Sequence, residues 1–201
     1  MAVTHKSTHK NAVRSRQMIK KAFAEMLNEK DITKITVTDI VEKAGISRGT
    51  FYAHYMDVYD LYNAIETNMM ETVRETIDSV GAKNILLDPS GVITSAFTFL
   101  EAKKAYYKLF VTTSRSDSLI NRIVTYVGDR LTAEIDSSFS DAETKEVRLF
   151  IYYSLGAIES NVKAWLDEKI PMNGTECAAL ISGYYLKSKP DAMQKLAEEK
   201  E

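Results

Sequence analysis

The sequence predicts an all-α protein of about nine helices, in which a small N-terminal part precedes a larger C-terminal part. Three observations lead to this prediction. The chain of 201 residues contains only eight glycines and three prolines, too few for the many tight turns of a β-sandwich or barrel. Its composition, 45% apolar and 27% charged, is that of a globular chain. Apolar side chains recur at helical spacing through most of the sequence, and we expect no strand.

The first 80 residues are expected to form four helices. Thr36 can cap the amide of Asp39 at the start of the second helix. Gly45 ends that helix, because glycine adopts the left-handed conformation at no steric cost. Ser47 and Asp57 are the expected caps of the next two helices. The expected ranges are 13–29, 36–44, 48–55 and 58–80, preceded by a polar and flexible segment over 1–11.

The rest of the chain is expected to form about five further helices, again from the spacing of apolar side chains. The pair Asp88-Pro89 marks one start, since a capping residue is followed by proline at the first helical position. Residues 81–87 are expected to interrupt the helices, and the charged tail after Pro190 is expected to fray. The expected ranges are 89–100, 106–110, 119–131, 142–169 and 175–187.

The two parts of the chain differ in charge. Residues 1–56 carry ten Lys or Arg and five Asp or Glu, a net charge of +5, whereas residues 57–201 have a net charge of −7. We therefore expect an N-terminal domain over 1–56, made of the flexible basic arm and three helices, that meets a polyanion. Residues 57–201 form the second expected domain, with 57–80 as a connecting helix. The alternative is a chance excess of cations on solvated helix faces.

Several classes of protein have little support in this sequence. No uninterrupted apolar stretch exceeds five residues, and no apolar segment follows the first charges, so we expect neither a membrane span nor a secretory signal. The lone Cys177 fits a reducing cytoplasm. His5 and His9 lack the glutamate of a zinc-protease helix, and no glycine-rich phosphate loop occurs. An enzyme is thus disfavoured, and we expect no cofactor and no metal.

The segment 36–55 carries the most information about function. Two short helices joined by a three-residue turn that contains Gly45 form a helix-turn-helix. The second helix of this motif places its first residues on base edges in the major groove of DNA. Arg48 is the expected reader, since its fork matches the O6 and N7 acceptors of guanine. The residues expected to approach or hold the DNA backbone are Gly49, Thr50, Tyr52 and His54.

This segment resembles the DNA-binding signature of tetracycline-repressor-type regulators, the TetR/AcrR family. The resemblance rests on Ala44-Gly45-Ile46-Ser47, on Gly49-Thr50-Phe51-Tyr52 and on His54-Tyr55, all in register. It implies an all-helical homodimer with a three-helix DNA-binding head and a larger body that binds a ligand. Position by position, it assigns contact with double-stranded DNA to Thr38, Ser47, Arg48, Gly49, Thr50, Tyr52, Ala53 and His54.

Val58 departs from the family pattern. Many members carry a lysine at this position, where the side chain contacts a phosphate. We hypothesise that a cation of the N-terminal segment replaces that contact, since a flexible basic arm can follow the DNA backbone. The candidates are Lys6, Lys10, Arg14 and Arg16.

Residues 81–188 are rich in aromatic side chains. For most of them core packing is a sufficient explanation. The resemblance implies in addition that a subset lines an apolar pocket for a small-molecule effector among the middle helices. The candidates are Phe97, Leu100, Phe110, Tyr126 and Tyr153.

The late helix is expected to contribute to a dimer interface. Gly156, Ala157 and Ser160 on its flank allow another helix to approach closely. Together with the helix over 175–187 it could form half of a four-helix interface, which the resemblance also implies, with Trp165 as an anchor. The alternative is ordinary packing within one chain.

The expected function is that of a sequence-specific DNA-binding regulator, a repressor by family habit, that a small apolar ligand releases from a palindromic operator. The ligand would favour a state in which the two heads of the homodimer lose the spacing of one DNA turn. Two alternatives stay open. One is a ligand- or protein-binding module of the same fold without operator binding, and the other is an enzyme.

Overall fold

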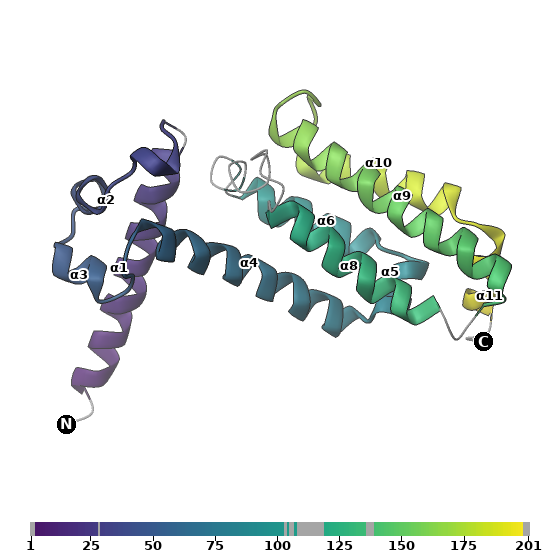
Figure 1. Ribbon diagram of the computed structural model, residues 1–201, viewed down its shortest axis with the longest axis horizontal. Helices are drawn as coiled ribbons and strands as arrows, with labels where there is room; N and C mark the ends of the chain where they lie inside the picture. The colour runs from purple at the N-terminus through teal and green to yellow at the C-terminus, as the bar shows by residue number, and fades with distance from the viewer. Residues whose placement is uncertain are drawn as a thin grey trace. The chain divides into compact units, whose positions relative to one another are not determined.

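In the structure, a computed structural model, helices are the only regular secondary structure among the residues that it describes (Figure 1). These residues are 3–27, 29–102, 104, 107, 119–135 and 139–198. Within them lie ten α-helices and one short 3-10 helix, η1. The helices are α1 (Val3–Leu27), η1 (Ile32–Lys34), α2 (Val37–Ala44), α3 (Arg48–Tyr52), α4 (Val58–Val80), α5 (Ala82–Leu87), α6 (Ser90–Glu101), α8 (Leu119–Ile135), α9 (Asp141–Leu166), α10 (Gly174–Ser188) and α11 (Asp191–Glu198). The all-α prediction is confirmed.

The chain divides into two compact units, residues 1–69 and 70–201, and the boundary falls within α4. The change in charge predicts a boundary before this helix, after residue 56. The first turns of α4 carry the buried side chains Val58, Leu61 and Ile65, which belong to the first unit. Burial of these side chains explains why the boundary between the two units lies later in the sequence than the change in net charge suggests.

The first unit has a core made by one face each of α1, α2 and α3. These three helices contact one another (Figure 1). The side chains that are completely buried come from each α-helix of the unit, since hydrophobic burial is what holds such short helices in place. They are Ile19, Phe23, Ile40, Phe51 and Leu61.

Helix α1 begins at Val3, ten residues earlier than the predicted start at Val13. The prediction of a flexible segment over 1–11 rested on the lack of apolar periodicity. No glycine or proline occurs between Val3 and Leu27. A helix nucleated by the packed part of α1 can therefore extend through polar residues, each adding one backbone hydrogen bond.

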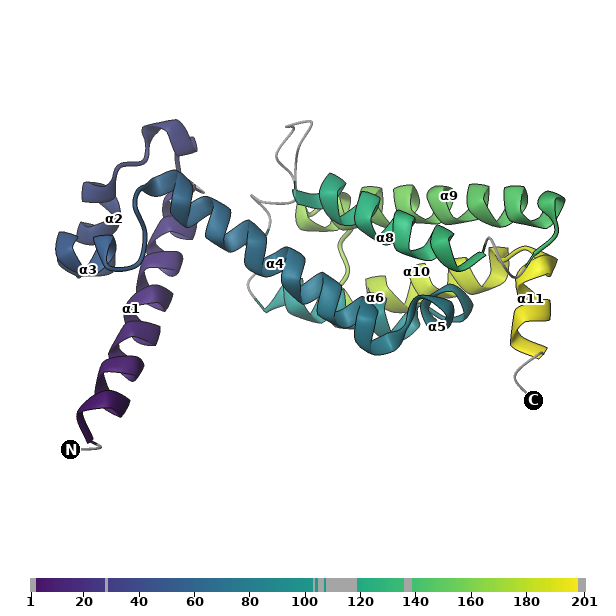
Figure 2. The same ribbon diagram turned by 60° about the horizontal axis from the view of Figure 1, so that its bottom comes forward.

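The second unit contains two pairs of packed helices, α6 with α10 and α8 with α9 (Figure 2). Its core cluster joins residues from α4, α5, α8, α9, α10 and α11. The expected helices over 119–131, 142–169 and 175–187 are confirmed as α8, α9 and α10 with small differences at their ends. The short helix expected over 106–110 lies almost entirely outside the described residues.

Two predictions for the second unit are wrong. Residues 82–87 form α5 where an interruption was expected, and 191–198 form α11 where a frayed tail was expected. Leu86 and Met193 are both buried in the core cluster. The Tyr185 hydroxyl donates to the carbonyl of Leu86 at 2.8 Å. A backbone acceptor at the end of α5 thus finds its hydrogen-bond partner 99 positions later in the chain. Tertiary burial, not local sequence, stabilises both helices.

Among the described residues, no helix combines the length and apolar character needed to cross a lipid bilayer.

Candidate nucleic-acid interface

The turn between α2 and α3 has the geometry that its sequence predicts. Thr36 and Asp39 form a capping box, in which each side chain accepts from the other's backbone amide, at 3.2 Å and 2.9 Å. Gly45 adopts the left-handed conformation, with φ 64° and ψ 38°. Ser47 then caps α3, since its hydroxyl accepts from the amide of Thr50 at 3.1 Å. This part of the prediction is confirmed residue by residue.

Helix α3 is shorter than expected and ends at Tyr52, not at Tyr55. The amides of His54 and Tyr55 both bond to the carbonyl of Phe51, at 2.9 Å and 3.0 Å, which closes the helix in a tight turn. Phe51 is fully buried, while the neighbouring Tyr52 is 57% exposed. The turn thus anchors α3 on one side and leaves its other side open to solvent.

Arg48 and Thr38 contact each other across the exposed edge of the motif. The Nη2 group of Arg48, the first residue of α3, donates to the Thr38 hydroxyl at 2.6 Å. Thr38 lies in the first turn of α2. Arg48 itself is exposed.

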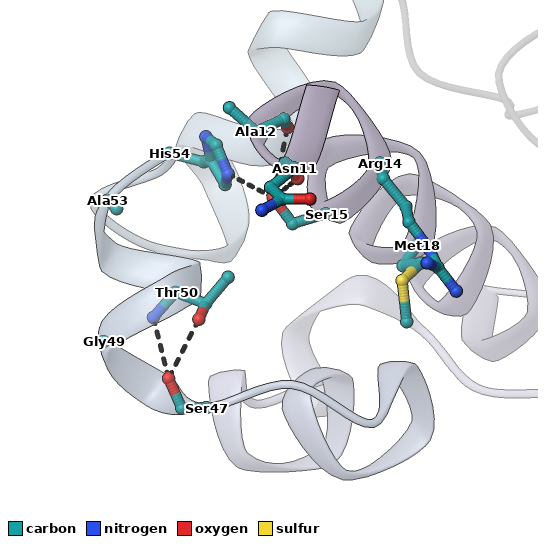
Figure 3. A pocket seen from close by; sticks show the side chains of 10 residues that line it. All are labelled: Asn11, Ala12, Arg14, Ser15, Met18, Ser47, Gly49, Thr50, Ala53 and His54. Atoms are coloured by element: carbon teal, nitrogen blue, oxygen red, sulfur yellow. Dashed lines mark hydrogen bonds between the residues drawn. The ribbon is translucent and has the colours of Figure 1, made fainter. Parts of the chain in front are cut away.

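A groove of about 640 Å³ separates α1 from α3 (Figure 3). We call it the α1–α3 groove. Side chains from both helices line it, and most of them are polar or small. They are Asn11, Ala12, Arg14, Ser15, Met18, Ser47, Gly49, Thr50, Ala53 and His54.

His54 lies at one end of this groove and bonds to α1 (Figure 3). Its Nδ1 accepts from Nε of Arg16 at 3.3 Å, and its Nε2 lies 2.7 Å from the Ser15 hydroxyl. The Ser15 hydroxyl in turn donates to the carbonyl of Asn11 at 3.0 Å. These roles fit a neutral imidazole with its proton on Nε2. Burial, and then the charge of Arg16, lower the pKa of His54.

This arrangement predicts that the first unit loses stability in mild acid. Because the folded state lowers the pKa of His54 below its ordinary value of 6.5, the unfolded chain binds the proton more readily. The stability that neutral His54 contributes is complete when the pH is above the pKa of the unfolded chain. It is lost as the pH falls through the lower pKa of the folded protein. Urea unfolding between about pH 8 and about pH 5 measures the effect. His54→Asn should show a weaker pH dependence than the wild type, and an equal dependence would contradict the prediction.

The charges of the first unit are arranged unevenly. Its acidic residues near the end of α1 are paired, with Lys43 bonded to Glu29 at 2.9 Å. Lys30 bonds to Asp39 at 2.8 Å and, together with Thr36, lowers the pKa of that carboxyl to about 2. No acidic residue precedes Glu25 in the sequence, whereas six Lys or Arg do. The part of α1 that borders the groove is therefore positive.

The eight residues predicted to contact DNA all lie in the first unit, around α3. Five of them line the α1–α3 groove, and Tyr52 is exposed beside it. Thr38 and Arg48 are instead bonded to each other. His54 is half-buried, and its ring nitrogens bond to Ser15 and Arg16 of α1, contacts that the sequence does not predict. The five groove-lining members of the set are Ser47, Gly49, Thr50, Ala53 and His54.

The sequence does not predict the contribution of α1 to the groove, above all that of Asn11, Ser15 and Met18. Their polar and apolar pattern gives no signal in the sequence, which predicts a flexible arm over residues 1–11. Val58, which replaces the phosphate-binding lysine of the family pattern, is only 7% exposed. Arg14, one of the proposed replacements, lines the groove.

The residues predicted to line a ligand pocket have different environments. Phe97 and Leu100 are buried in α6, and the Phe97 ring packs edge-on against Trp165 at 5.1 Å. The guanidinium of Arg74 lies over the Tyr126 ring, 5.5 Å from its centre. Tyr153 is 67% exposed, and Phe110 lies outside the described residues. The pocket stays a prediction.

Helices α9 and α10 present an exposed apolar face. On α9 the exposed residues of this face are Leu149, Tyr153, Gly156, Ala157 and Ser160. A Cβ added to Gly156 would meet no atom within 4 Å, so there is space here for a partner. On α10 the exposed large side chains of this face are Leu180 and Tyr184.

The prediction that Trp165 anchors a dimer interface is wrong. Trp165 is 1% exposed and its indole N–H donates to the carbonyl of Met172 at 3.0 Å. The ammonium group of Lys104 lies over the same ring, 4.7 Å from its centre. Trp165 therefore packs within its own chain, because it lies on the inward face of α9 with Val162 and Leu166.

The sequence of the first unit matches known regulators. Residues 19–65 match the family model described as "Bacterial regulatory proteins, tetR family". The HTH-type transcriptional regulator YxbF of Bacillus subtilis (strain 168), itself uncharacterized, is 35% identical over 101 residues, which cover 50% of this chain and 24% of that protein. The dhaKLM operon transcriptional activator DhaS of Lactococcus lactis subsp. lactis (strain IL1403) is 28% identical over 104 residues, 51% of this chain and 52% of that protein.

These matches have a limited extent. They span between 24% and 52% of the length of the two curated relatives. The fold as a whole resembles that of a solved structure described as the fatty acid degradation regulator FadR from Bacillus halodurans. The two share 16% identity, with a TM-score of 0.64 over 87% of this chain and 95% of the other. This likeness concerns the fold alone.

Proposed function

Because residues 19–65 match the family model of tetR bacterial regulatory proteins, we propose that the chain belongs to that family and is a sequence-specific DNA-binding transcriptional regulator whose α3 enters the major groove. One observation carries this proposal. The exposed side of α3 faces solvent next to a part of α1 that contains cations and no acidic residue. An interface of polar groups and positive charge is what the phosphate backbone requires.

Different residues have different roles in this proposal. Arg48 reads a guanine through its O6 and N7 acceptors. The hydroxyl groups of the exposed Tyr52 and the half-buried Thr50 contact phosphates and set the register without reading sequence. Lys10 and Arg14 on α1 supply the phosphate contact that Val58 does not, since Val58 is buried and apolar.

The proposed assembly is a homodimer in which the α9–α10 face meets the same face of a second copy. Such an isologous contact covers the exposed apolar side chains of both helices. The two-fold axis then presents two α3 helices to consecutive major grooves, about 34–36 Å apart, and implies a palindromic operator. The small residues Gly156, Ala157 and Ser160 support close helix approach at this axis.

The second unit is proposed to bind a small apolar effector. Its interior is rich in aromatic and aliphatic side chains, which suit an apolar ligand better than a charged one. An effector can bind more tightly to a dimer whose heads lack the spacing that fits DNA. It then lowers the affinity for DNA by at most the ratio of its affinities for the two states of the dimer. We propose repression as the outcome, because a dimer seated on a promoter obstructs the polymerase. Deletion of the gene should then raise transcription from the bound promoter.

The main test is a gel-shift measurement on duplexes that the wild-type protein selects from a random DNA pool. Arg48→Ala should weaken binding by about 1–3 kcal/mol and relax the preference at one base pair. Lys34→Ala, which removes an exposed cation of η1 away from α3, is the matched control and should have little effect. Selection of no DNA at low ionic strength would refute the proposal and favour a binding module without operator recognition.

A further inference from the structure

Thr38 and Arg48 were both expected to contact DNA, yet the structure joins them to each other. The donor is Nη2 of Arg48 and the acceptor is the Thr38 hydroxyl, 2.6 Å apart. We propose that Thr38 is a positioning residue, which holds the guanidinium of Arg48 in the orientation that reads one base pair. This inference rests on the proposed function, because it assigns a role in operator recognition.

The backbone on both sides of this hydrogen bond is held by helix caps. Thr38 lies within the capping box of α2, between Thr36 and Asp39, and the Asp39 carboxylate also bonds to Lys30 at 2.8 Å. Arg48 follows the Ser47 cap of α3. Ile40 and Phe51 fix the two helices through the core of the unit. The flexible part of the arrangement is therefore the Arg48 side chain itself.

The chemistry of the contact leaves Arg48 able to bind DNA. A guanidinium carries five N–H donors, and the hydroxyl occupies one of them. The remaining donors suffice for the bidentate pair with guanine. Thr38 is neutral, so it orients the guanidinium without cancelling its charge, as a carboxylate would. The nearby carboxylate of Asp39 is engaged by Lys30 and the amide of Thr36.

Pre-orientation has a measurable consequence. An exposed arginine loses much rotamer freedom when it binds a base edge. A side chain already held by Thr38 loses less on binding, so the hydroxyl strengthens recognition of the base that Arg48 reads and of no other base. A direct contact from Thr38 to a phosphate would instead strengthen binding to all sequences equally.

The test compares Thr38→Val, which removes the hydroxyl at nearly constant shape, with Thr38→Ser, which keeps it. Both are measured on the duplex selected by the wild type and on its single-base-pair variants. Thr38→Val should weaken binding about 2–10-fold, only on duplexes that keep the base pair read by Arg48. Thr38→Ser should behave as the wild type. In the Arg48→Ala background, Thr38→Val should have no further effect.

The outcomes separate this inference from the proposed function. An equal loss on every duplex, or a loss that persists in the Arg48→Ala background, would overturn the positioning role and make Thr38 a backbone contact. Tighter binding by Thr38→Val would overturn it too, because the hydroxyl would then compete with DNA for Arg48. Wild-type protein that selects no duplex would instead refute the proposed function. Thermal unfolding checks the fold of each variant, and Thr38→Ala replaces Thr38→Val if the valine variant is unstable.

Discussion

Phe51→Ala is expected to lower the free energy of unfolding of the first unit by about 3–5 kcal/mol. Phe51 is completely buried and is the residue of α3 that packs into the core of that unit. Its removal leaves a cavity between short helices that have few other contacts to close it. Small domains are stable by about 5–15 kcal/mol, so the change would leave a marginal unit. Urea unfolding followed by circular dichroism measures the loss.

Tyr52→Ala is the matched control for this substitution. It removes a ring of similar size from the next position, but Tyr52 is exposed, and little stability should be lost. Tyr52→Ala should still weaken DNA binding, since we place its hydroxyl on a phosphate. The two variants therefore separate stability from recognition. Similar unfolding curves for both would mean that Phe51 does not hold α3 in place.

Tyr153→Glu is expected to convert the dimer into monomers and to weaken operator binding by about 10²–10⁴-fold. Tyr153 lies in the middle of the exposed apolar face of α9, beside Leu149 and Ala157. A charge there would be buried without a partner at the proposed interface, which costs far more than a surface charge. Each monomer would then contact one half-site alone. Sedimentation equilibrium and gel-shift titration measure the two effects.

Met172→Glu provides the control for this experiment. Met172 is also exposed and apolar, but it lies between α9 and α10 and outside their exposed face. This variant should remain dimeric and bind the operator as the wild type does. A Tyr153→Glu protein that stays dimeric would place the interface elsewhere. A monomeric variant with unchanged affinity would mean that the second head adds nothing to binding.

Local signals predicted the helix-turn-helix accurately because its hydrogen bonds join neighbours in sequence. Thr36 bonds to Asp39, and Ser47 bonds to Thr50, each three residues apart. Such bonds depend on residue type and spacing alone. The same reasoning failed for α5 and α11, whose formation depends on burial against residues far along the chain.

Helix α1 illustrates a different limit. Its polar half shows no apolar period and therefore predicts a flexible arm, although no glycine or proline in it interrupts a helix. As a consequence, the α1–α3 groove could not be predicted. Trp165 shows the same limit in the second unit, since periodicity places it on a helix but does not say which face meets a partner.

The amino-acid sequence by itself determined the helical class, the caps and turn of α2 and α3, and the relation to a family of regulators. The helical class depends on the apolar period, the caps and turn on hydrogen bonds within a few residues, and the family relation on residue types at matched positions. Only the tertiary structure decided that His54 bonds to Ser15, 39 residues away, and that Arg48 bonds to Thr38. It also decided that Trp165 faces inward. Such contacts depend on how packed helices orient their side chains toward each other, which residue type and spacing do not specify.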